Sequence, residues 1–518
     1  MKKKYNLFFL AMALLLANQL QAQELHIVEG GSLFVLPNNA LYVNNNLSVS
    51  GTGVVTISSN ATNSGSLIVS GTAAGNITYI KYIPSDTWYL VSAPVMTQDI
   101  GAFVVNEANA IRESNTNNYG VSRYNNENPS GSRWEYYTST AGPLAASSAG
   151  NFMNGIGYSN LRVEAGNYTF NGALASADVT VTLPASTNHR WSVVGNPYPS
   201  FMPANIKAND TNNILNQNIN NLDTGFEALY FWDGITYKPF NHSSDALNLT
   251  PGQAFVIRTK SNDLDFTFPK NLQREQVAEA VTLYKRADTP EITLSLQSGS
   301  NTTTTNIKYL QNATKGLDVG YDAGTYQEGS AVLAIDTHLV ADSKGTNFTL
   351  QCLPNKEYET SIVPLSIKAP ANESISFSAE AIHLPSDVKV FLEDKEAQTY
   401  TDITTSAYQV TSKKAFNGIG RFYIHTSNKN VLNTEDAAIV STINMYKTSN
   451  TNLRVAGSQQ KGSATLKMYT LLGKEVLSYN FEMATVNDIP LPQNLATGIY
   501  VVQLMANGTK QTKKLRIQ

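Results

Sequence analysis

Residues 498–518 read GIYVVQLMANGTKQTKKLRIQ, and this stretch decides the fold class. Its first part, up to Leu504, is dense in β-branched and aromatic residues, which favour strands. Asn507 and Gly508 tolerate the positive φ angles of a type I′ turn, so they predict a two-residue hairpin. Beyond this turn, a final strand is expected to place Lys510, Lys514 and Arg516 on one face and Leu515 and Ile517 on the other, as in a strand with one solvent-exposed face. The chain is therefore expected to end in a β-hairpin.

The same strand pattern continues upstream and predicts an all-β protein. A strand-like run leads into a Gly473-Lys474 turn, and residues 438–518 are expected to form one compact β unit. A polar linker at 428–437 precedes this unit. Residues 287–427 hold about eight alternating runs and no long helical period, which favours an Ig-like β-sandwich.

Two further β regions occupy the first half of the chain. Residues 23–83 contain short strand-like runs about every ten residues, separated by Asn and Gly, which is typical of a short solenoid or equally of a meander. Residues 84–276 are expected to form an aromatic-rich β domain, in which the segments WYLVSAP (88–94) and WSVVGNPYPS (191–200) end strands at prolines. An Asn-rich stretch at 205–221 predicts a loop with at most a short helix.

Residues 1–22 have the pattern of a secretory signal peptide. Three lysines at 2–4 precede an apolar run at 7–17, and Ala22 offers a small residue at the expected cleavage point. The apolar run is too short to span a bilayer, and no Cys follows the cleavage region to accept a lipid. We therefore expect export through the general export machinery, with an uncleaved membrane anchor as the alternative.

Cysteine and charge restrict the class of protein further. Cys352 is the only cysteine, so hydrophobic cores rather than disulfides must hold the domains together. It lies in an alternating run and is expected to be buried, with a catalytic thiol as the alternative.

The charge is unevenly distributed along the chain. Residues 438–518 carry nine Lys and Arg against three Asp and Glu, whereas residues 23–437 have a net charge of −12. An acidic body argues against a nucleic-acid partner, which requires a clustered basic face.

The terminal β unit resembles the type A C-terminal sorting domain of proteins exported by the type IX secretion system of Gram-negative bacteria. The resemblance rests on LLGKEV at 471–476, LPQNLATGIYVVQL at 491–504 and NGTKQTKKLRIQ at 507–518. The residues that carry this sorting-signal motif are Gly473, Lys474, Gly498, Tyr500, Asn507, Gly508, Lys513 and Lys514.

This resemblance implies a fold, a route and a set of partners. The terminal unit is expected to be an Ig-like sandwich that the type IX translocon reads and its C-terminal signal peptidase removes. The cargo would reach the exterior through the periplasm and be released or attached to surface lipopolysaccharide or glycans. The segments at 88–94 and 191–200 are similar to those of non-enzymatic β-rich surface proteins, so an adhesive or structural role is the leading hypothesis.

Motifs that would indicate an enzyme or a cofactor are absent from the sequence. It holds no HExxH, Gly-x-Ser-x-Gly, Walker A, GxGxxG or EF-hand pattern, so we expect no enzymatic activity and no cofactor. A hydrolase that acts on polysaccharides, with carboxylates that meet only in space, remains an alternative. Asp318, Asp322 and Glu328 offer oxygen ligands for Ca²⁺, although turn residues that bond their own backbone explain the pattern better.

Aromatic residues suggest another alternative, a carbohydrate-binding surface protein. The candidate sugar-stacking platform comprises Trp191, Tyr198, Tyr230, Trp232 and Tyr237. A hydrophobic core with its turns explains the same residues more simply. The histidines are dispersed singly, so we interpret them as surface or strand residues.

Overall fold

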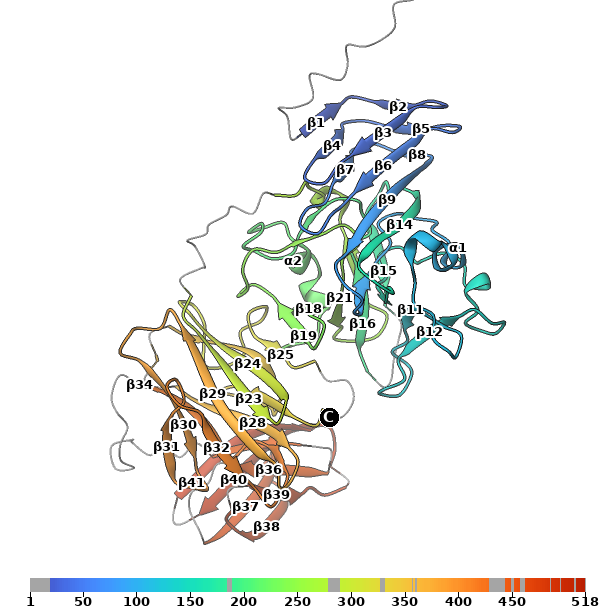
Figure 1. The fold of residues 1–518 in the computed structure, drawn as a ribbon. Helices are drawn as coiled ribbons and strands as arrows, with labels where there is room; N and C mark the ends of the chain where they lie inside the picture. The colour runs from blue at the N-terminus through green and yellow to red at the C-terminus, as the bar shows by residue number, and fades with distance from the viewer. Residues whose placement is uncertain are drawn as a thin grey trace, which may run out of the picture. The chain divides into compact units, whose positions relative to one another are not determined.

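The computed structural model divides the chain into two compact units, Met1–Tyr284 and Lys285–Gln518, and each is described separately (Figure 1). The described residues are 19–183, 189–277, 289–326, 331–355, 357–358, 361–427, 443–448, 451–456, 462–484, 486–493, 495–506 and 509–517. Strands dominate both units, as expected for an all-β protein. Among the described residues, no helix is long and apolar enough to cross a membrane.

The first unit begins with strands that stack turn upon turn into a short three-sided solenoid (Figure 1). One strand of each turn joins each side, and neighbouring turns pair in parallel. A meander would pair its strands antiparallel, so the pairing distinguishes the two alternatives that the sequence left open. The three sides are β1 (Gln19–Ala22), β4 (Ala40–Val43) and β7 (Ser66–Val69); β2 (Leu25–Ile27), β5 (Leu47–Val49) and β8 (Ala73–Ala74); and β3 (Ser32–Val35), β6 (Val54–Ser58) and β9 (Asn76–Ile83).

The last parallel strand of the solenoid, β9, ends at Ile83, and a strand from much further along the chain extends the third side. Strand β14 (Gly166–Ala173) pairs antiparallel with β9 along its whole length and extends the third side. The first hydrophobic core accordingly runs on from the solenoid to Leu174. Helix α1 (Ile100–Val105) contributes Phe103, whose ring stacks on Phe170 of β14 at a centroid distance of 4.8 Å. The solenoid and the region after it therefore share one core.

The remaining strands of the first unit form small antiparallel sheets. The sheets are β10 (Tyr89–Val91), β13 (Tyr158–Asn160), β11 (Asn118–Tyr124) and β12 (Trp134–Thr138); β16 (Trp191–Gly195), β21 (Ala254–Arg258), β18 (Leu229–Trp232) and β19 (Tyr237–Phe240); β15 (Val179–Thr182) with β22 (Asp265–Phe268); and β17 (Met202–Pro203) with β20 (Asn248–Leu249). Short 3₁₀ turns lie at Glu107–Asn109, Ala146–Ser148, Ile219–Asn221 and Lys270–Leu272.

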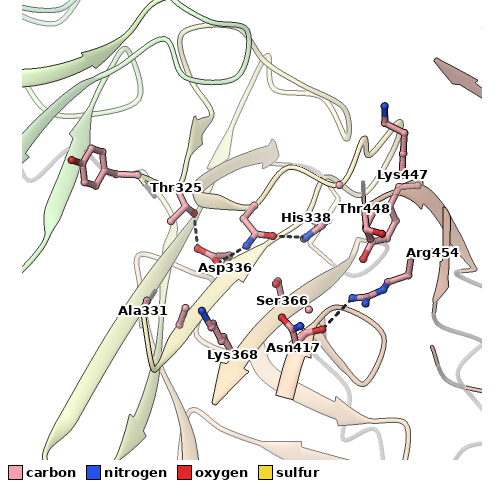
Figure 2. A pocket seen from close by; sticks show the side chains of 16 residues that line it. Thr325, Ala331, Asp336, His338, Ser366, Lys368, Asn417, Lys447, Thr448 and Arg454 are labelled. Atoms are coloured by element: carbon pink, nitrogen blue, oxygen red, sulfur yellow. Dashed lines mark hydrogen bonds between the residues drawn. The ribbon is translucent and has the colours of Figure 1, made fainter. Parts of the chain in front are cut away.

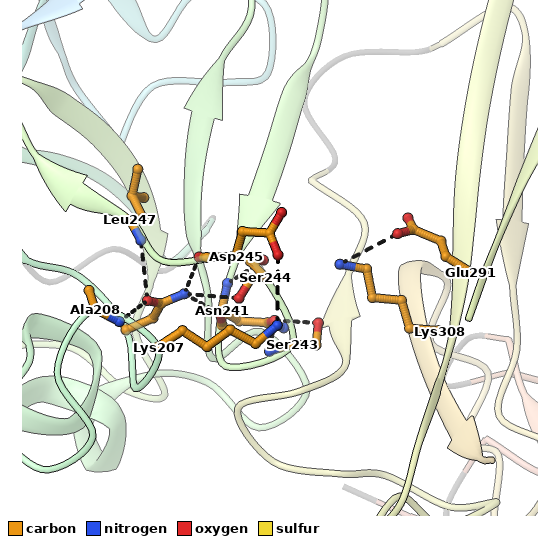
Figure 3. Close-up of polar contacts among 10 residues, drawn as sticks. Lys207, Ala208, Asn241, Ser243, Ser244, Asp245, Leu247, Glu291 and Lys308 are labelled. Atoms are coloured by element: carbon orange, nitrogen blue, oxygen red, sulfur yellow. Dashed lines mark hydrogen bonds and ion pairs between the residues drawn. The ribbon is translucent and has the colours of Figure 1, made fainter. Parts of the chain in front are cut away.

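The Asn-rich stretch contains the short helix that its sequence predicts, α2 (Ile214–Asn218). The stretch is held in place by Asn205, which is buried. The Asn205 amide group donates hydrogen bonds to the carbonyl oxygens of Asn241 and Asp245 at 3.0 and 2.8 Å. Figure 3 labels these two acceptor residues. Its Oδ1 accepts from the backbone N–H of Ala208 at 3.2 Å. The Asn205 side chain therefore supplies hydrogen bonds to backbone groups that have no strand partner in this loop.

The second unit opens with a sheet of twelve strands, ten of which form one continuous hydrogen-bonded path. A sandwich of separate sheets was expected, but here the path folds over on itself, and Phe377 and Phe422 from distant strands meet at 4.7 Å. In order along the path, the strands are β31 (Thr399–Asp402), β30 (Lys389–Asp394), β34 (Phe422–Ser427), β28 (Ile362–Ala369), β26 (Ala334–Thr337), β27 (Phe348–Pro354), β24 (Asn301–Leu310), β23 (Glu291–Ser298), β29 (Ser374–Ile382) and β32 (Tyr408–Thr411), with β25 (Ala323–Gly324) beside β27 and β33 (Phe416–Gly418) beside β28. We call these twelve strands and their loops the middle domain.

The chain ends in a sandwich of two sheets around its own core. Strand β40 (Gly498–Ala506) lies between β37 (Ser463–Thr470) and β41 (Thr509–Ile517), and it is buried on one face only, because Tyr500 is buried while Ile499 is exposed. In β41 Lys510 and Lys514 face solvent and Leu515 is buried, which is the alternation that the sequence predicts. The sheets are β35 (Asn444–Lys447), β36 (Asn452–Ala456) and β39 (Val486–Pro490), and β38 (Glu475–Glu482), β37 (Ser463–Thr470), β40 (Gly498–Ala506) and β41 (Thr509–Ile517).

Candidate functional site

The five aromatic residues of the candidate platform do not share one surface. Trp191, Tyr198 and Tyr230 are all buried. Trp191 packs edge-on against Tyr230 at a centroid distance of 5.0 Å. The Tyr198 hydroxyl donates to the carbonyl oxygens of Ala177 and Phe268 at 2.8 and 2.9 Å. These three residues form part of the core of the first unit and cannot stack on a ligand from solvent. A hydrophobic core is the simpler of the two explanations that their sequence pattern allowed.

The other two platform residues lie together on the β18–β19 hairpin. Trp232 and Tyr237 are cross-strand partners, half-buried, with ring centroids 5.0 Å apart. Between them, the Asp233 carboxylate accepts hydrogen bonds from the backbone N–H groups of Ile235 and Thr236 at 2.9 and 2.7 Å. This cap fixes the turn, and it leaves the Ile235 side chain 83% exposed. We call Trp232, Ile235 and Tyr237 the aromatic hairpin.

The candidate Ca²⁺ ligands serve as backbone acceptors instead. The buried Asp322 carboxylate accepts from the backbone N–H groups of Asp318 and Cys352 at 2.7 and 2.6 Å. Asp318 in turn accepts from Thr314 N at 2.7 Å. Both carboxylates thus stabilise turns, as the favoured interpretation has it. Glu328 lies outside the described residues, and within them no group of three or more His, Cys, Asp or Glu is placed to hold a metal ion.

Cys352 occupies the buried position that its alternating run predicts. Its side chain is fully buried, and Sγ lies 3.3 Å from the carbonyl oxygen of Tyr321. A thiol without access to solvent cannot attack a substrate, so a nucleophilic role is excluded for this conformation.

The sorting-signal residues occupy turns and strands of the terminal domain. Gly473 adopts a φ of 85° at the tip between β37 and β38, where Leu472 is 98% exposed. The Tyr500 hydroxyl donates to the Ala496 carbonyl oxygen at 2.8 Å, and Gly498 opens the same strand. Lys474 and Lys514 are exposed, while Lys513 is partly buried. Asn507 and Gly508 lie outside the described residues.

Strand β26 and the loop after it carry a polar network that the sequence analysis missed (Figure 2). Asp336 accepts hydrogen bonds from Thr325 Oγ1 at 2.5 Å and from Asn347 Nδ2 at 2.9 Å. The Asn347 Oδ1 atom is then left to accept from His338 Nε2 at 2.8 Å. The signal was present in the sequence, because Asp336 and His338 alternate in the run AIDTH of an otherwise apolar strand.

Burial controls the protonation of this network. It raises the pKa of Asp336 to about 6, against the opposing effect of the hydrogen bonds from Thr325 and Asn347. Burial also lowers the pKa of His338 to about 4, so the imidazole is neutral at pH 7. A neutral imidazole that donates through Nε2 has its lone pair on Nδ1. That nitrogen faces Ser343 Oγ at 3.4 Å, which is longer than the reach typical of a nucleophile and its base.

The network forms one wall of a polar cavity of about 390 Å³. The middle domain contributes Asp336, His338 and Lys368 to this cavity, and the terminal domain contributes Tyr446 and Arg454 (Figure 2). Strand β35 places the Tyr446 ring 5.6 Å from the His338 ring. The cavity therefore exists only while the two domains of the second unit are in contact.

Comparison with known families gives two matches. Residues 12–425 match a family described as Domain of unknown function (DUF8693), and residues 447–518 match the secretion system C-terminal sorting domain. The second match confirms the resemblance of the terminal domain and makes the chain a substrate of the type IX secretion system. A tail of this kind directs a protein to the cell surface or the medium. No curated protein matches the chain.

Proposed function

The chain belongs to the DUF8693 family and ends in a sorting domain, and from this premise we propose that it is a non-enzymatic adhesive protein of the outer cell surface. The signal peptide would take it to the periplasm, and the type IX translocon would take it across the outer membrane. There the sorting domain is removed and the remainder binds a surface or is shed into the medium.

The aromatic hairpin is the observation that carries the adhesive role. An aliphatic side chain exposed at 83% is unfavourable in water, and here it stands beside two half-buried aromatic rings. Large apolar groups gathered on an exposed tip are typical of interaction sites. The Asp233 cap holds the tip in one conformation, so little conformational entropy is lost on contact.

The test compares two exposed aliphatic residues of the first unit. Ile235→Ser removes the apolar tip, and Val105→Ser removes an exposed valine at the end of α1. Purified protein is added to washed cells and to immobilised surface material, and the bound fraction is measured. We expect Ile235→Ser to reduce binding by about tenfold or more, as a buried contact residue would. Equal binding by the two variants would exclude the aromatic hairpin as the adhesive site.

A carbohydrate-binding role is the second candidate, and the Trp232–Tyr237 pair favours it. Sugar rings stack on aromatic faces, and the Trp232 and Tyr237 rings lie half-buried, with centroids 5.0 Å apart, beside the exposed turn. Retention on insoluble polysaccharides distinguishes the candidates. Loss of retention by Trp232→Ala but not by Ile235→Ser would indicate stacking on a sugar. If purified cargo cleaves the polysaccharide, the non-enzymatic proposal is wrong and the hydrolase alternative replaces it.

The export route has its own test. Peptides from washed cell surface, periplasm and medium are identified by mass spectrometry. We expect peptides between residues 25 and 429 outside the cell and peptides beyond residue 441 to be missing there. Terminal peptides that remain on exterior protein would rule out removal of the sorting domain. Confinement of every peptide to the periplasm would contradict export itself.

A further inference from the structure

A glycine of the middle domain leaves space for a side chain of the sorting domain. Gly345 has a φ of 86°, a conformation that L side chains rarely adopt. A Cβ atom at this position would lie 2.5 Å from Cδ2 of Tyr446. The Tyr446 ring therefore rests directly on the backbone of the 338–347 loop, and it is buried there.

A second glycine of the middle domain, Gly418, leaves space for a second side chain of the sorting domain, Arg454. Gly418 has a φ of 104°, and a Cβ atom there would lie 2.5 Å from Nη1 of Arg454. The same Nη1 donates to the Asn417 carbonyl oxygen at 3.1 Å. Asp488 of the sorting domain binds Nε and Nη2 of Arg454 at 2.8 Å each, so the guanidinium is oriented before it meets the middle domain.

A third contact comes from the last strand. Lys513 Nζ donates to the Ser343 carbonyl oxygen at 2.9 Å. The next residue, Lys514, is exposed. Apolar packing across the contact is small, since the cluster that joins the two domains consists of Ile419, Tyr446 and Ala456. The contact thus consists of two close packing contacts and two hydrogen bonds, with little apolar surface to strengthen it.

We propose that Ser343, Gly345, Asn417 and Gly418 form a docking face for the sorting domain of the same chain, and that docking lasts only while the chain between the domains is intact. A short covalent connection supplies an effective concentration on the order of 1 mM. A contact with a Kd of roughly 0.1 mM is then about 90% occupied in the intact chain and less than about 10% occupied once the pieces are free at ~10 μM.

Undocking has a structural consequence for the cargo. The sorting domain supplies the Tyr446 and Arg454 wall of the cavity. Its departure opens the cavity and exposes His338 and the loop that carries Ser343 to solvent. The sorting domain is thus a removable cover over a polar surface of the middle domain. This inference does not rest on the adhesive role, because it concerns only contacts within the second unit.

The experiment cuts the chain between the middle domain and the sorting domain and measures how well the docking face is protected from solvent. A specific protease site is inserted in segment 428–442 of the full chain, purified without its signal peptide. Size-exclusion chromatography at ~10 μM and hydrogen exchange of the 343–347 amides are measured before and after cutting. We expect separation of the pieces, together with exchange that is about tenfold faster or more. Co-elution with unchanged protection would overturn the proposal, and so would equal exchange before and after the cut.

Neighbouring lysines supply the matched variants. Lys513→Ala removes a bond to the docking face, whereas Lys514→Ala changes an exposed side chain of the same strand. In the uncut chain, Lys513→Ala is expected to speed exchange at 343–347, and Lys514→Ala is expected to leave it unchanged. Arg454→Ala should act like Lys513→Ala. Thermal melting of each variant verifies that the sorting domain remains folded, and identical exchange in all three variants would exclude the docking face.

Discussion

Two aromatic pairs, each with one residue on strand β18, show that the residue type alone does not determine the role of a side chain. In β18, Tyr230 contacts Trp191 and Trp232 contacts Tyr237, each at a centroid distance of 5.0 Å. The first pair is buried in the core and the second lies half-exposed beside a turn. Tyr230 and Trp232 are two residues apart, so both point to the same side of the strand. The two residues differ in burial because other segments of the chain cover Tyr230, whereas Trp232 lies beside the exposed turn.

The largest expected effect separates these two pairs directly. Trp191→Ala should destabilise the first unit by about 3–5 kcal/mol, since it leaves a cavity in the core. Trp232→Ala should cost less than about 1 kcal/mol, as is usual near a surface. Urea unfolding followed by tryptophan fluorescence measures both, because all four Trp residues of the chain lie in the first unit. Similar losses in the two variants would mean that the aromatic hairpin is part of the core.

Two aspartates extend the comparison to polar residues. Asp322 is buried and accepts from two backbone N–H groups, whereas Asp318 is only partly buried. Asp322→Ala should therefore cost about 2–4 kcal/mol, because it leaves buried donors without partners. Asp318→Ala should cost about 1 kcal/mol. Circular dichroism during urea unfolding checks both values, and a melting temperature that rises with added Ca²⁺ would instead favour the metal site.

The buried His338 and Asp336 should make opposite contributions to acid stability. The folded pKa of His338, about 4, lies below its ordinary 6.5, so its contribution to stability is lost as pH falls from about 6.5 to about 4. The folded pKa of Asp336, about 6, lies above its ordinary 3.8, so its contribution is present at low pH and lost as pH rises from about 3.8 to about 6. The two contributions offset each other in the native protein.

Single variants should reveal each of these contributions. Asp336→Asn should make the stability of the second unit fall as pH decreases below 6.5, because only the His338 contribution remains. His338→Gln should make stability fall as pH rises from about 4 to about 6. Thermal melting at several pH values measures both slopes. Parallel profiles for the native protein and the two variants would contradict the offset.

The smallest expected effect concerns strand β1. Residues 19–22 fall within the expected signal peptide, yet they pair with β4 at the edge of the solenoid. A protein that starts at Gln23 loses only this edge strand, so its stability should change by about 1 kcal/mol or less. Mass spectrometry of the mature N-terminus shows whether cleavage removes β1. A large loss of stability in the shortened protein would contradict this expectation and show that β1 is an essential part of the solenoid.

Local patterns explain what was predictable. The alternation at Lys514 and Leu515, the short helix at Ile214 and the buried Cys352 all follow from residues adjacent in sequence. The pairing of β9 with a strand beyond the solenoid could not be predicted, for the opposite reason. Strand β9 has the pattern of a last solenoid strand, but its antiparallel partner β14 begins only at Gly166. A pairing between strands so far apart in sequence leaves no local trace.

The sequence by itself determined the all-β class, because strand periodicity and turn residues act over a few positions, and its resemblance to a known family identified the sorting tail. Only the tertiary structure decided that the first strands stack in parallel, that Trp191 is core while Trp232 is surface, and that Asp336 and His338 join through Asn347. It also placed Gly345 beneath Tyr446 and Gly418 beneath Arg454. Each of these features depends on which distant segments come into contact, and burial by those segments sets the pKa, the packing and the exposure of every residue involved.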